Sequence, residues 1–312
     1  MDIIEVKNVT KRYSGHLALD SVSLAIPEGS VFGLLGPNGA GKTSLIRLIT
    51  QITGPDEGVL LFRGETLSPR HLIRMGYLPE ERGLYRKMEV GEQALYLARL
   101  KGLSRQDALK RLKFWFEKFS IQAWWNKKVE ELSKGMAQKV QFITTVLHDP
   151  EFIILDEPFT GFDPINAELV KNELLELRLK GTTIVLSTHR MESVEELCSH
   201  IALINRAKVI LDGSVKDIRH RFRTHAYRIR FSGEPSALVA AMGNSGTLLG
   251  MVPEEDVHHA TVRLSASVSI NDFLRSAIAV VSILGLEEVI PDMNDIFIQQ
   301  VNADPMTQPV NA

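Results

Sequence analysis

The most constraining feature of this 312-residue chain is a glycine-rich segment at 36–43. An apolar run at 31–35, which predicts a buried strand, precedes it, and an amphipathic run at 44–49, which predicts a helix, follows it. Glycines let backbone N–H groups point inward at an anion, and the helix adds the positive end of its dipole. The segment therefore matches the phosphate-binding pattern G-x-x-x-x-G-K-[ST]. Its residues are Gly36, Pro37, Asn38, Gly39, Ala40, Gly41, Lys42 and Thr43.

Two side chains at the end of this segment have direct uses with a bound nucleotide. Lys42 brings a positive charge to the outer phosphates, and the Thr43 hydroxyl can hold Mg²⁺. We also count Ser44, which opens the following helix, among the nucleotide-binding residues. The loop by itself leaves GTPases, RecA-like ATPases, kinases and transporter ATPases open as classes.

A second predicted strand begins at Phe152 and ends in two adjacent acids, Asp156 and Glu157. A buried strand tolerates acids only at its tip, where a metal and water can solvate the charge. Asp156 is therefore placed to bind Mg²⁺, directly or through water, and Glu157 to orient or deprotonate the attacking water. The Asn-Lys-x-Asp pattern that reads guanine is absent, since the nearest match, at 126–129, lacks the acid. A GTPase is therefore disfavoured.

A short motif upstream of these acids carries a family resemblance. The segment 132–136 reads Leu-Ser-Lys-Gly-Met and precedes a helix-like run at 137–147. It resembles the L-S-G-G-Q signature of ABC-type ATPases, with two positions substituted. A serine hydroxyl and free backbone N–H groups at a helix start form a second anion site. The resemblance implies that Ser133 and Gly135 close on ATP held by a partner subunit.

Three further positions resemble the same family in the same order along the chain. Tyr13 resembles the aromatic residue that stacks on the adenine ring. Asp163 lies in a segment, 160–164, that resembles the D-loop and would couple two nucleotide sites across a dimer. His189 follows an apolar strand predicted at 182–186 and resembles the switch histidine that reaches the γ-phosphate.

The segment 75–80 resembles the Q-loop, except that Glu80 stands where most members of the family carry glutamine. A glutamine offers a neutral oxygen to Mg²⁺ or to the lytic water, whereas Glu80 brings a negative charge beside phosphates. Three alternatives stay open: Glu80 binds Mg²⁺ more strongly, carries a raised pKa, or is a solvated loop acid. The stretch 77–85, together with 132–136, resembles the sodium-exporter (NatA-type) branch of the family.

The resemblance to ABC ATPases covers about residues 2–218 and implies the fold and the partners. It implies an α/β P-loop NTPase core at 2–221 with an inserted helical subdomain at about 85–131. The chain would bind ATP and Mg²⁺ and hydrolyse ATP as a homodimer or heterodimer beneath separate polytopic permease subunits of an exporter, with sodium as the suggested cargo. The alternative is a soluble ABC-type ATPase of translation or DNA repair, which usually carries tandem cassettes or a long coiled-coil insertion.

Composition agrees with a soluble protein that works with a separate membrane partner. The net charge is −2, 44% of the residues are hydrophobic, and the one cysteine, Cys198, fits a reducing cytoplasm. The residues after Met1 show no signal-peptide pattern. The longest apolar stretch, around 277–286, is far below the ~20 residues that cross a bilayer. We therefore expect a cytoplasmic location, peripheral on the inner face of the cell membrane, and we expect no nucleic-acid partner.

The inserted segment should hold a small aromatic core. Ser104 and Asp107 resemble a capping box in its acidic variant and predict a helix over 105–119. Trp124 and Trp125 are expected to cap the same core. The apolar residues of this helix, at helical spacing, are Ala108, Leu109, Leu112, Trp115, Phe116 and Phe119.

Lysine occurs up to Lys216 and nowhere after it, which marks a boundary. Beyond it the patterns predict a strand, a helix, two strands and a helix, an order that suggests a small α+β ferredoxin-like domain at 222–302. Its expected role is regulatory or dimer-supporting, and 303–312 reads as a loose tail. The basic run at 219–230 could face anionic lipid or nucleic acid, but a solvated linker is favoured. The predicted elements are 227–231, 235–242, 247–252, 259–264, 270–284 and a final amphipathic piece at 294–301, with core residues Leu238, Val239, Phe273, Ile278 and Val281.

Overall fold

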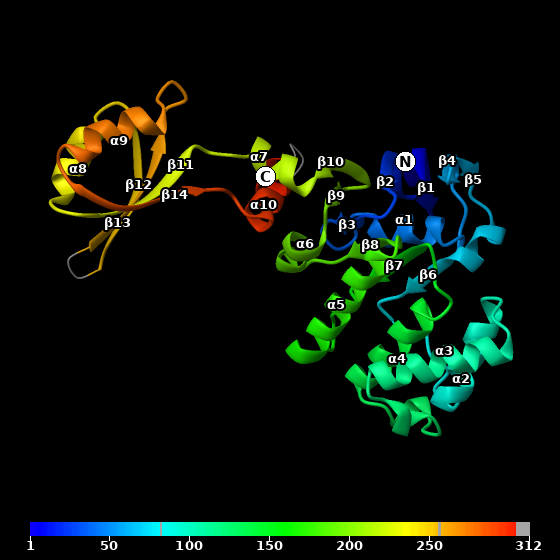
Figure 1. Cartoon of the computed structure of the whole chain (residues 1–312). Coiled ribbons are helices and arrows are strands. Elements are labelled where there is room, and N and C mark those ends of the chain that lie inside the picture. The colour runs from blue at the N-terminus through cyan, green and yellow to red at the C-terminus, as the bar shows by residue number, and fades with distance from the viewer. Residues whose placement is uncertain (82, 255–256, 304–312) are drawn as a thin grey trace. The chain divides into compact units, whose positions relative to one another are not determined.

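The computed structural model describes residues 1–81, 83–254 and 257–303 (Figure 1). Its internal contacts divide the chain into two compact units. The first comprises Met1–Val215 with Gln300–Ala312, and the second comprises Lys216–Gln299. Of the tail predicted at 303–312, only Ala303 lies within the described residues, where it ends a helix.

The first unit is built on a six-stranded, mainly parallel sheet (Figure 1). Its strand order is β10-β9-β3-β8-β7-β6, and only β10 runs antiparallel to its neighbour. Every residue of β3, β7 and β8 is buried, as expected for parallel strands covered on both faces. The strands predicted around the glycine-rich segment, the acid pair and His189 are therefore confirmed. The six strands are β3 (Val31–Leu35), β6 (Met75–Leu78), β7 (Phe152–Asp156), β8 (Thr183–Ser187), β9 (His200–Asn205) and β10 (Lys208–Ser214).

A second, antiparallel sheet packs beside the first. It contains β1 (Asp2–Tyr13), β2 (His16–Pro27), β4 (Glu57–Phe62) and β5 (Glu65–Thr66) in the order β2-β1-β4-β5. One apolar cluster joins both sheets to helix α1 (Lys42–Ile49), and it includes Ile4, Phe32 and Ile46. The sequence predicted strands here but not a separate sheet, because alternation shows which residues face a core and not which strands pair.

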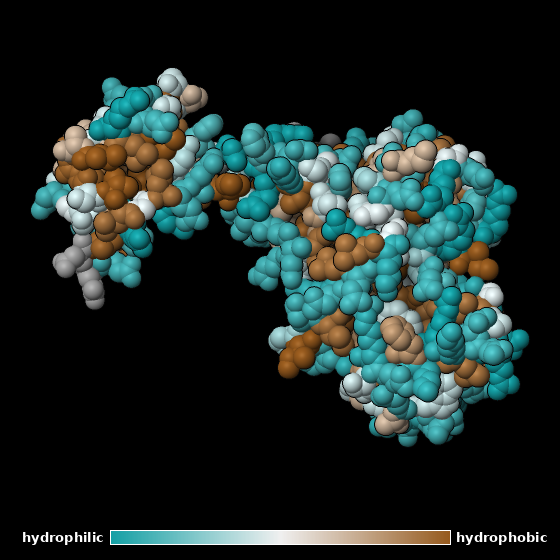
Figure 2. All heavy atoms as spheres, viewed as in Figure 1, coloured by the Kyte–Doolittle hydropathy of each residue, from teal (hydrophilic) through white to brown (hydrophobic). Residues whose placement is uncertain are grey.

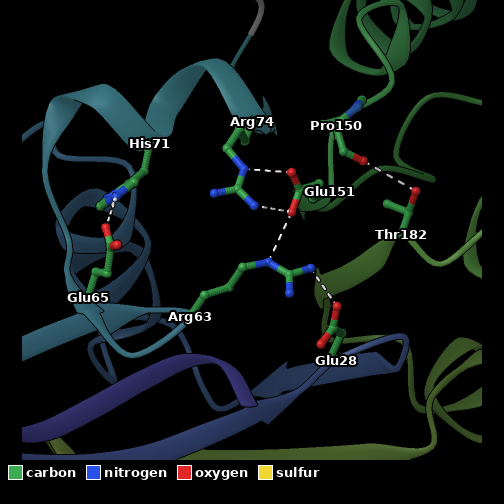
Figure 3. A network of polar contacts seen from close by, with 8 residues as sticks. All are labelled: Glu28, Arg63, Glu65, His71, Arg74, Pro150, Glu151 and Thr182. Carbon is green, nitrogen blue, oxygen red and sulfur yellow. Dashed lines mark hydrogen bonds and ion pairs between the residues drawn. The ribbon is translucent and has the colours of Figure 1, made fainter. Parts of the chain in front are cut away.

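Charged side chains connect the two sheets at the amino-terminal ends of β6 and β7 (Figure 3). Arg74 Nε and Nη2 each lie 2.5 Å from a carboxylate oxygen of Glu151, and Arg63 Nε lies 3.0 Å from Glu151 Oε2. Arg63 Nη2 also lies 2.5 Å from Glu28 Oε1. The hydrogen bonds from Arg74, before all other causes, lower the pKa of Glu151. A bidentate guanidinium–carboxylate pair thus fixes the starts of two parallel strands.

Helices α2 (Val90–Leu100), α3 (Arg105–Lys118) and α4 (Lys134–Val146) form the inserted subdomain. The predicted core of α3 is buried, with one exception: Leu109 is 38% exposed. It lies on the outer side of a helix whose apolar stripe is narrower than its apolar content. The Trp125 ring lies 5.5 Å from the Phe116 ring, as expected. Ser104 caps the helix by accepting the Asp107 N–H, while its hydroxyl donates to the Asp107 carboxylate.

Helices also cover the main sheet and follow it. They are α5 (Pro164–Leu179), α6 (Met191–Leu197) and α7 (Val215–Arg221), with a 3₁₀ turn at Pro69–Arg74. Lys118 of α3 pairs with Glu173 and Glu176 of α5 at 2.5 and 2.8 Å. Since Glu173 is almost fully buried, this pair ties the helical subdomain to the core.

The second unit is a four-stranded antiparallel sheet with two helices, in the order β12-β13-β11-β14. The chain order β-α-β-β-α-β confirms the ferredoxin-like prediction and extends it by a strand. The helix predicted over 270–284 is wrong beyond Ile278, because 282–289 forms a strand. A continuous apolar run does not distinguish a helix end from a buried strand. The elements are β11 (Ala226–Ser232), α8 (Pro235–Met242), β12 (Gly246–Glu254), β13 (Val257–Leu264), α9 (Ile270–Ile278) and β14 (Ser282–Val289).

Three of the five predicted core residues of this unit are buried, and two are not. Leu238, Phe273 and Val281 lie in its apolar cluster. Val239 and Ile278 are 40% and 63% exposed, since each occupies the outer side of its helix. Figure 2 shows hydrophobic residues gathered on the surface of this unit.

The basic run at 219–230 is not the predicted linker throughout, because part of it forms α7 and part forms β11. Arg223 and Arg228 lie 3.6 Å from Glu288 and Glu287. After β14 the chain forms α10 (Met293–Ala303), which confirms the predicted final amphipathic piece. Among the described residues, no helix is both long enough and apolar enough to span a bilayer.

Candidate nucleotide-binding site

A cleft of about 370 Å³ lies at the carboxyl ends of the parallel strands. Ligands of open α/β sheets bind at this end, where loops after the strands meet. Eleven of the predicted site residues line it, and the sequence had not indicated His16, Ala18 and Arg47. The lining residues are Tyr13, His16, Ala18, Asn38, Gly39, Gly41, Lys42, Thr43, Ser44, Arg47, Glu80, Asp156, Glu157 and His189.

The backbone of the glycine-rich loop requires glycine at two places. Gly36 and Gly41 have φ of 148° and 120°, which side chains rarely allow. A Cβ at Gly36 would stand 2.1 Å from the Ile204 carbonyl oxygen, and one at Gly41 would stand 2.5 Å from that of Ala18. Gly36, Pro37 and Ala40 do not line the cleft; they shape the loop from behind.

Lys42 lies across its own loop. Its Nζ donates hydrogen bonds to Gly36 O at 2.7 Å and Pro37 O at 3.1 Å. Burial lowers the pKa of Lys42, and the charges of Asp156, Glu157 and Glu80 oppose this shift. A phosphate in the loop would offer this partly desolvated cation a stronger partner than two carbonyl groups.

Asp156 ends β7 inside the cleft and is 7% exposed. Burial raises the pKa of its carboxyl group, and the nearby carboxylates of Glu80 and Glu157 add to the rise. A cation beside these acids would relieve the repulsion. The described residues contain no cluster of three or more His, Cys, Asp or Glu side chains that could hold a metal alone. The Thr43 hydroxyl and acidic oxygens in one cleft therefore fit Mg²⁺ that takes its other ligands from phosphates and water.

Glu157 is held by the segment that follows β8. Its carboxylate accepts hydrogen bonds from His189 N at 2.9 Å and from Thr188 Oγ1 at 3.3 Å, and Oε1 lies 2.7 Å from His189 Nδ1. Glu157 itself has a left-handed φ of 50°, and its N–H donates to Ser187 O at 2.8 Å. Strain of this kind persists where the surroundings over-determine the backbone, as they do at functional sites. The structure thus brings the predicted base and the predicted switch histidine into contact.

Tyr13 lines the cleft at the end of β1, and its hydroxyl oxygen is buried without a hydrogen-bond partner among the described residues. Lys11 Nζ lies 5.3 Å from the centre of its ring. The tyrosine ring is therefore available to a base at the far end of the cleft from the acids.

Ser133, Gly135 and Asp163 do not line the cleft. Ser133 Oγ caps α4 by accepting the Met136 N–H at 3.3 Å, and Asp163 caps α5 by accepting the Asn166 N–H at 2.9 Å. That backbone hydrogen bond, first among the causes, lowers the pKa of Asp163. A Cβ at Gly135 would stand 3.2 Å from Gly161 O, so the signature-like and D-loop-like segments adjoin each other.

The fold and the cleft define the chain as a P-loop nucleotide-binding protein. The profile of the ABC transporter family matches residues 19–160, and that of the C-terminal domain of DrrA1-3-like ATP-binding proteins matches 213–301. The uncharacterized ABC transporter ATP-binding protein YhaQ of Bacillus subtilis (strain 168) is 40% identical over 307 residues, covering 96% of this chain and 99% of that protein. The chain therefore belongs to the ATP-binding proteins of ABC transporters, which makes it an ATPase whose activity serves transport.

More distant relatives agree with this assignment. The ABC transporter ATP-binding protein NatA of Bacillus subtilis (strain 168) is 36% identical over 64% of this chain and 83% of its own length. A Nod factor export ATP-binding protein I of Cupriavidus metallidurans is 34% identical over 69% of this chain and 72% of its own. A solved ATP-binding subunit of an ABC transporter superposes with a TM-score of 0.66 at 30% identity, covering 70% of this chain and 93% of that one.

Proposed function

We propose that this chain powers an exporter as one of two ATPase subunits that enclose two ATP molecules between them. Each ATP would contact the glycine-rich loop of one chain and Ser133 and Gly135 of the other. The observation that carries the proposal is the separation of two anion-binding segments within one chain. The cleft contains the loop, Asp156 and Glu157, whereas Ser133 and Gly135 lie outside it and make no contact with it.

Within each site the residues would divide the chemistry between them. Lys42 and the loop N–H groups hold the phosphates, Tyr13 stacks on adenine, and Glu157 accepts the proton of the attacking water. His189 holds the Glu157 carboxylate now and would reach the γ-phosphate when ATP is bound. Asp163 would relate the two sites across the dimer. Bound Mg²⁺ would neutralise phosphate charge, held by Thr43, Asp156 and Glu80.

Replacement of Glu157 by glutamine tests this assignment. Glu157→Gln should retain ATP binding and lose hydrolysis by about 10²–10⁴-fold, the usual contribution of a general acid–base group. With hydrolysis blocked, a dimer should accumulate in ATP and dissociate in ADP, measured by light scattering after gel filtration. Hydrolysis near the wild-type rate would contradict the role of Glu157, and a monomer in ATP would contradict the shared site.

A surface on the helical subdomain suits a membrane partner. Tyr85, Tyr96 and Leu100 are 56%, 45% and 63% exposed, and α2 carries a groove of about 430 Å³ between Glu92 and Arg99. Exposed apolar side chains framed by charges are typical of a helix-binding surface. A permease subunit seated here would place the ATPase on the cytoplasmic face of the membrane. Sodium is the cargo suggested by the sequence resemblance, and a relative named for Nod factor export makes a larger cargo an alternative.

We assign the second unit a regulatory or dimer-supporting role. Its described residues carry no phosphate loop, and its two adjacent histidines have separate partners: His258 packs on the Phe231 ring, and His259 pairs with Glu254. Truncation after Lys216 should leave the ATP affinity intact while changing dimer stability or ATPase rate. Loss of ATP binding by a truncated protein that remains folded, as judged by circular dichroism, would contradict this role.

A further inference from the structure

Helix α4 lies directly on strand β6, and a glycine makes this close approach possible. A Cβ at Gly76 would stand 2.6 Å from the Thr145 carbonyl oxygen and 3.0 Å from Thr145 Cγ2. Any other residue would push the helix away from the strand. The helix that begins at Ser133 therefore rests on the backbone that leads to Glu80.

Side chains from this helix and the residues just after it meet backbone carbonyl groups along the strand. Residues spaced by three and four share a helix face, and the carbonyl groups of every second strand residue point to the same side. The two spacings match, so the helix and strand are in register over the whole contact. The pairs, in order along the strand, are His148 with Met75, Thr145 with Tyr77, and Gln141 with Pro79 and Glu81.

Gln141 makes the outermost of these contacts, on either side of Glu80. Its Nε2 donates to Pro79 O at 3.2 Å and to Glu81 O at 3.4 Å. The side chain is only 3% exposed, and its Oε1 has no hydrogen-bond partner in the described part of the chain. A buried amide is costly unless its hydrogen bonds are made, so this glutamine favours one position of the Glu80 backbone.

The same helix also reaches the second acidic segment of the cleft. Gln138 is 6% exposed, and its Nε2 donates to Pro158 O at 3.2 Å, one residue beyond Glu157. Helix α4 therefore holds the backbone beside both Glu80 and Glu157 through two buried glutamines, and its amino-terminal residue is the cap at Ser133.

We propose that Gln141 is a positioning residue that fixes Glu80 in the nucleotide cleft, so that α4 transmits a displacement of its Ser133 end to its own chain's site. This inference rests on the proposed role of Glu80 beside the nucleotide. A shift of α4 on contact with a second chain would move the carbonyl groups of Pro79 and Glu81 with it. Events at the two ends of one helix are thereby coupled.

Gln141→Met tests the proposal, because it keeps the side-chain length and removes the donor. We expect kcat to fall about tenfold, the factor equivalent to the loss of one net hydrogen bond. KM for ATP should change little. Glu80→Ala should lower kcat by at least as much, and the double variant should lose no more than Glu80→Ala alone, because Gln141 acts only through Glu80. Thr144→Val is the matched control on the same helix, since its hydroxyl bonds only to Gln141 O of its own helix.

Hydrogen exchange provides a readout that does not depend on activity. In the full-length chain, Gln141→Met should raise amide exchange at 80–81 and 83–85 and leave α2 and β7 unchanged. If Gln141→Met does not fold, Gln141→Glu keeps the volume, removes the donor, and should give the same pattern. Additive losses in the double variant, full activity of either single variant, or unchanged exchange would overturn the proposal. Failure of the Glu157 assignment would instead leave the exchange result intact, so the two failures are distinguishable.

Discussion

The two ends of the main sheet treat the same residue types in opposite ways. At the carboxyl end of β7, burial raises the pKa of Asp156, and Glu157 has a left-handed backbone. Six residues before Glu157, at the amino end, two arginines hold Glu151, and the hydrogen bonds of Arg74 lower its pKa (Figure 3). One end keeps acids under strain and desolvated, while the other pairs them fully.

This contrast separates function from stability on a single strand. Acids that gain a cation only on ligand binding cost stability in the free protein, whereas paired acids contribute to it. Substitutions at the cleft end should therefore change activity with little loss of stability. Substitutions at the amino end should do the reverse.

The larger expected effect belongs to Glu80, at the cleft end. Glu80→Gln removes one negative charge from a cleft that also holds Asp156 and Glu157, so the affinity for Mg²⁺ in the presence of ATP should fall about tenfold. The midpoint of a Mg²⁺ titration of ATP hydrolysis measures this change. The unfolding temperature should stay the same. An unchanged midpoint would show that Glu80 is a solvated loop acid, which was one of the alternatives left open by the sequence.

The smaller effect belongs to Glu151, at the amino end. Glu151→Gln should lower the free energy of unfolding by about 1 kcal/mol at neutral pH, because solvent screens a pair more than a third exposed. Since the folded-state pKa of Glu151 is lowered, its contribution is present above the unfolded pKa and is lost as pH falls through the folded value. The difference between wild type and variant in urea unfolding should therefore vanish in acid. A variant that instead loses ATPase activity at full stability would break the comparison.

The sequence predicted most of the first unit because its motifs are local. The loop, the acid pair and the strands before them are each specified within a few residues, and the structure places Lys42, Asp156, Glu157 and His189 around one cleft. Arg47 was missed although it lies four residues after Thr43, on the same face of α1. His16 was missed because only the pairing of β1 with β2 brings it to the cleft.

Pairing and helix ends account for what the sequence did not reveal. The run from Ala277 to Leu286 is apolar throughout, so periodicity gave no reason to end α9 at Ile278 and begin β14 at Ser282. Gln141 carried a detectable signal, since a glutamine between Val140 and Phe142 on a buried helix face requires a polar partner. Its partners, Pro79 O and Glu81 O, are backbone atoms about 60 residues away.

The central claim, that one chain completes the nucleotide site of another, is tested most directly by mixing two inactive variants. Lys42→Ala should abolish ATP binding at its own loop, and Ser133→Arg should bind ATP normally but hydrolyse none, since its large side chain blocks the partner's nucleotide. In an equal mixture of the two, half of the dimers should contain one intact site, so about a quarter of the wild-type ATPase activity should return. No recovery from the mixture, although size measurements show mixed dimers, would contradict the claim.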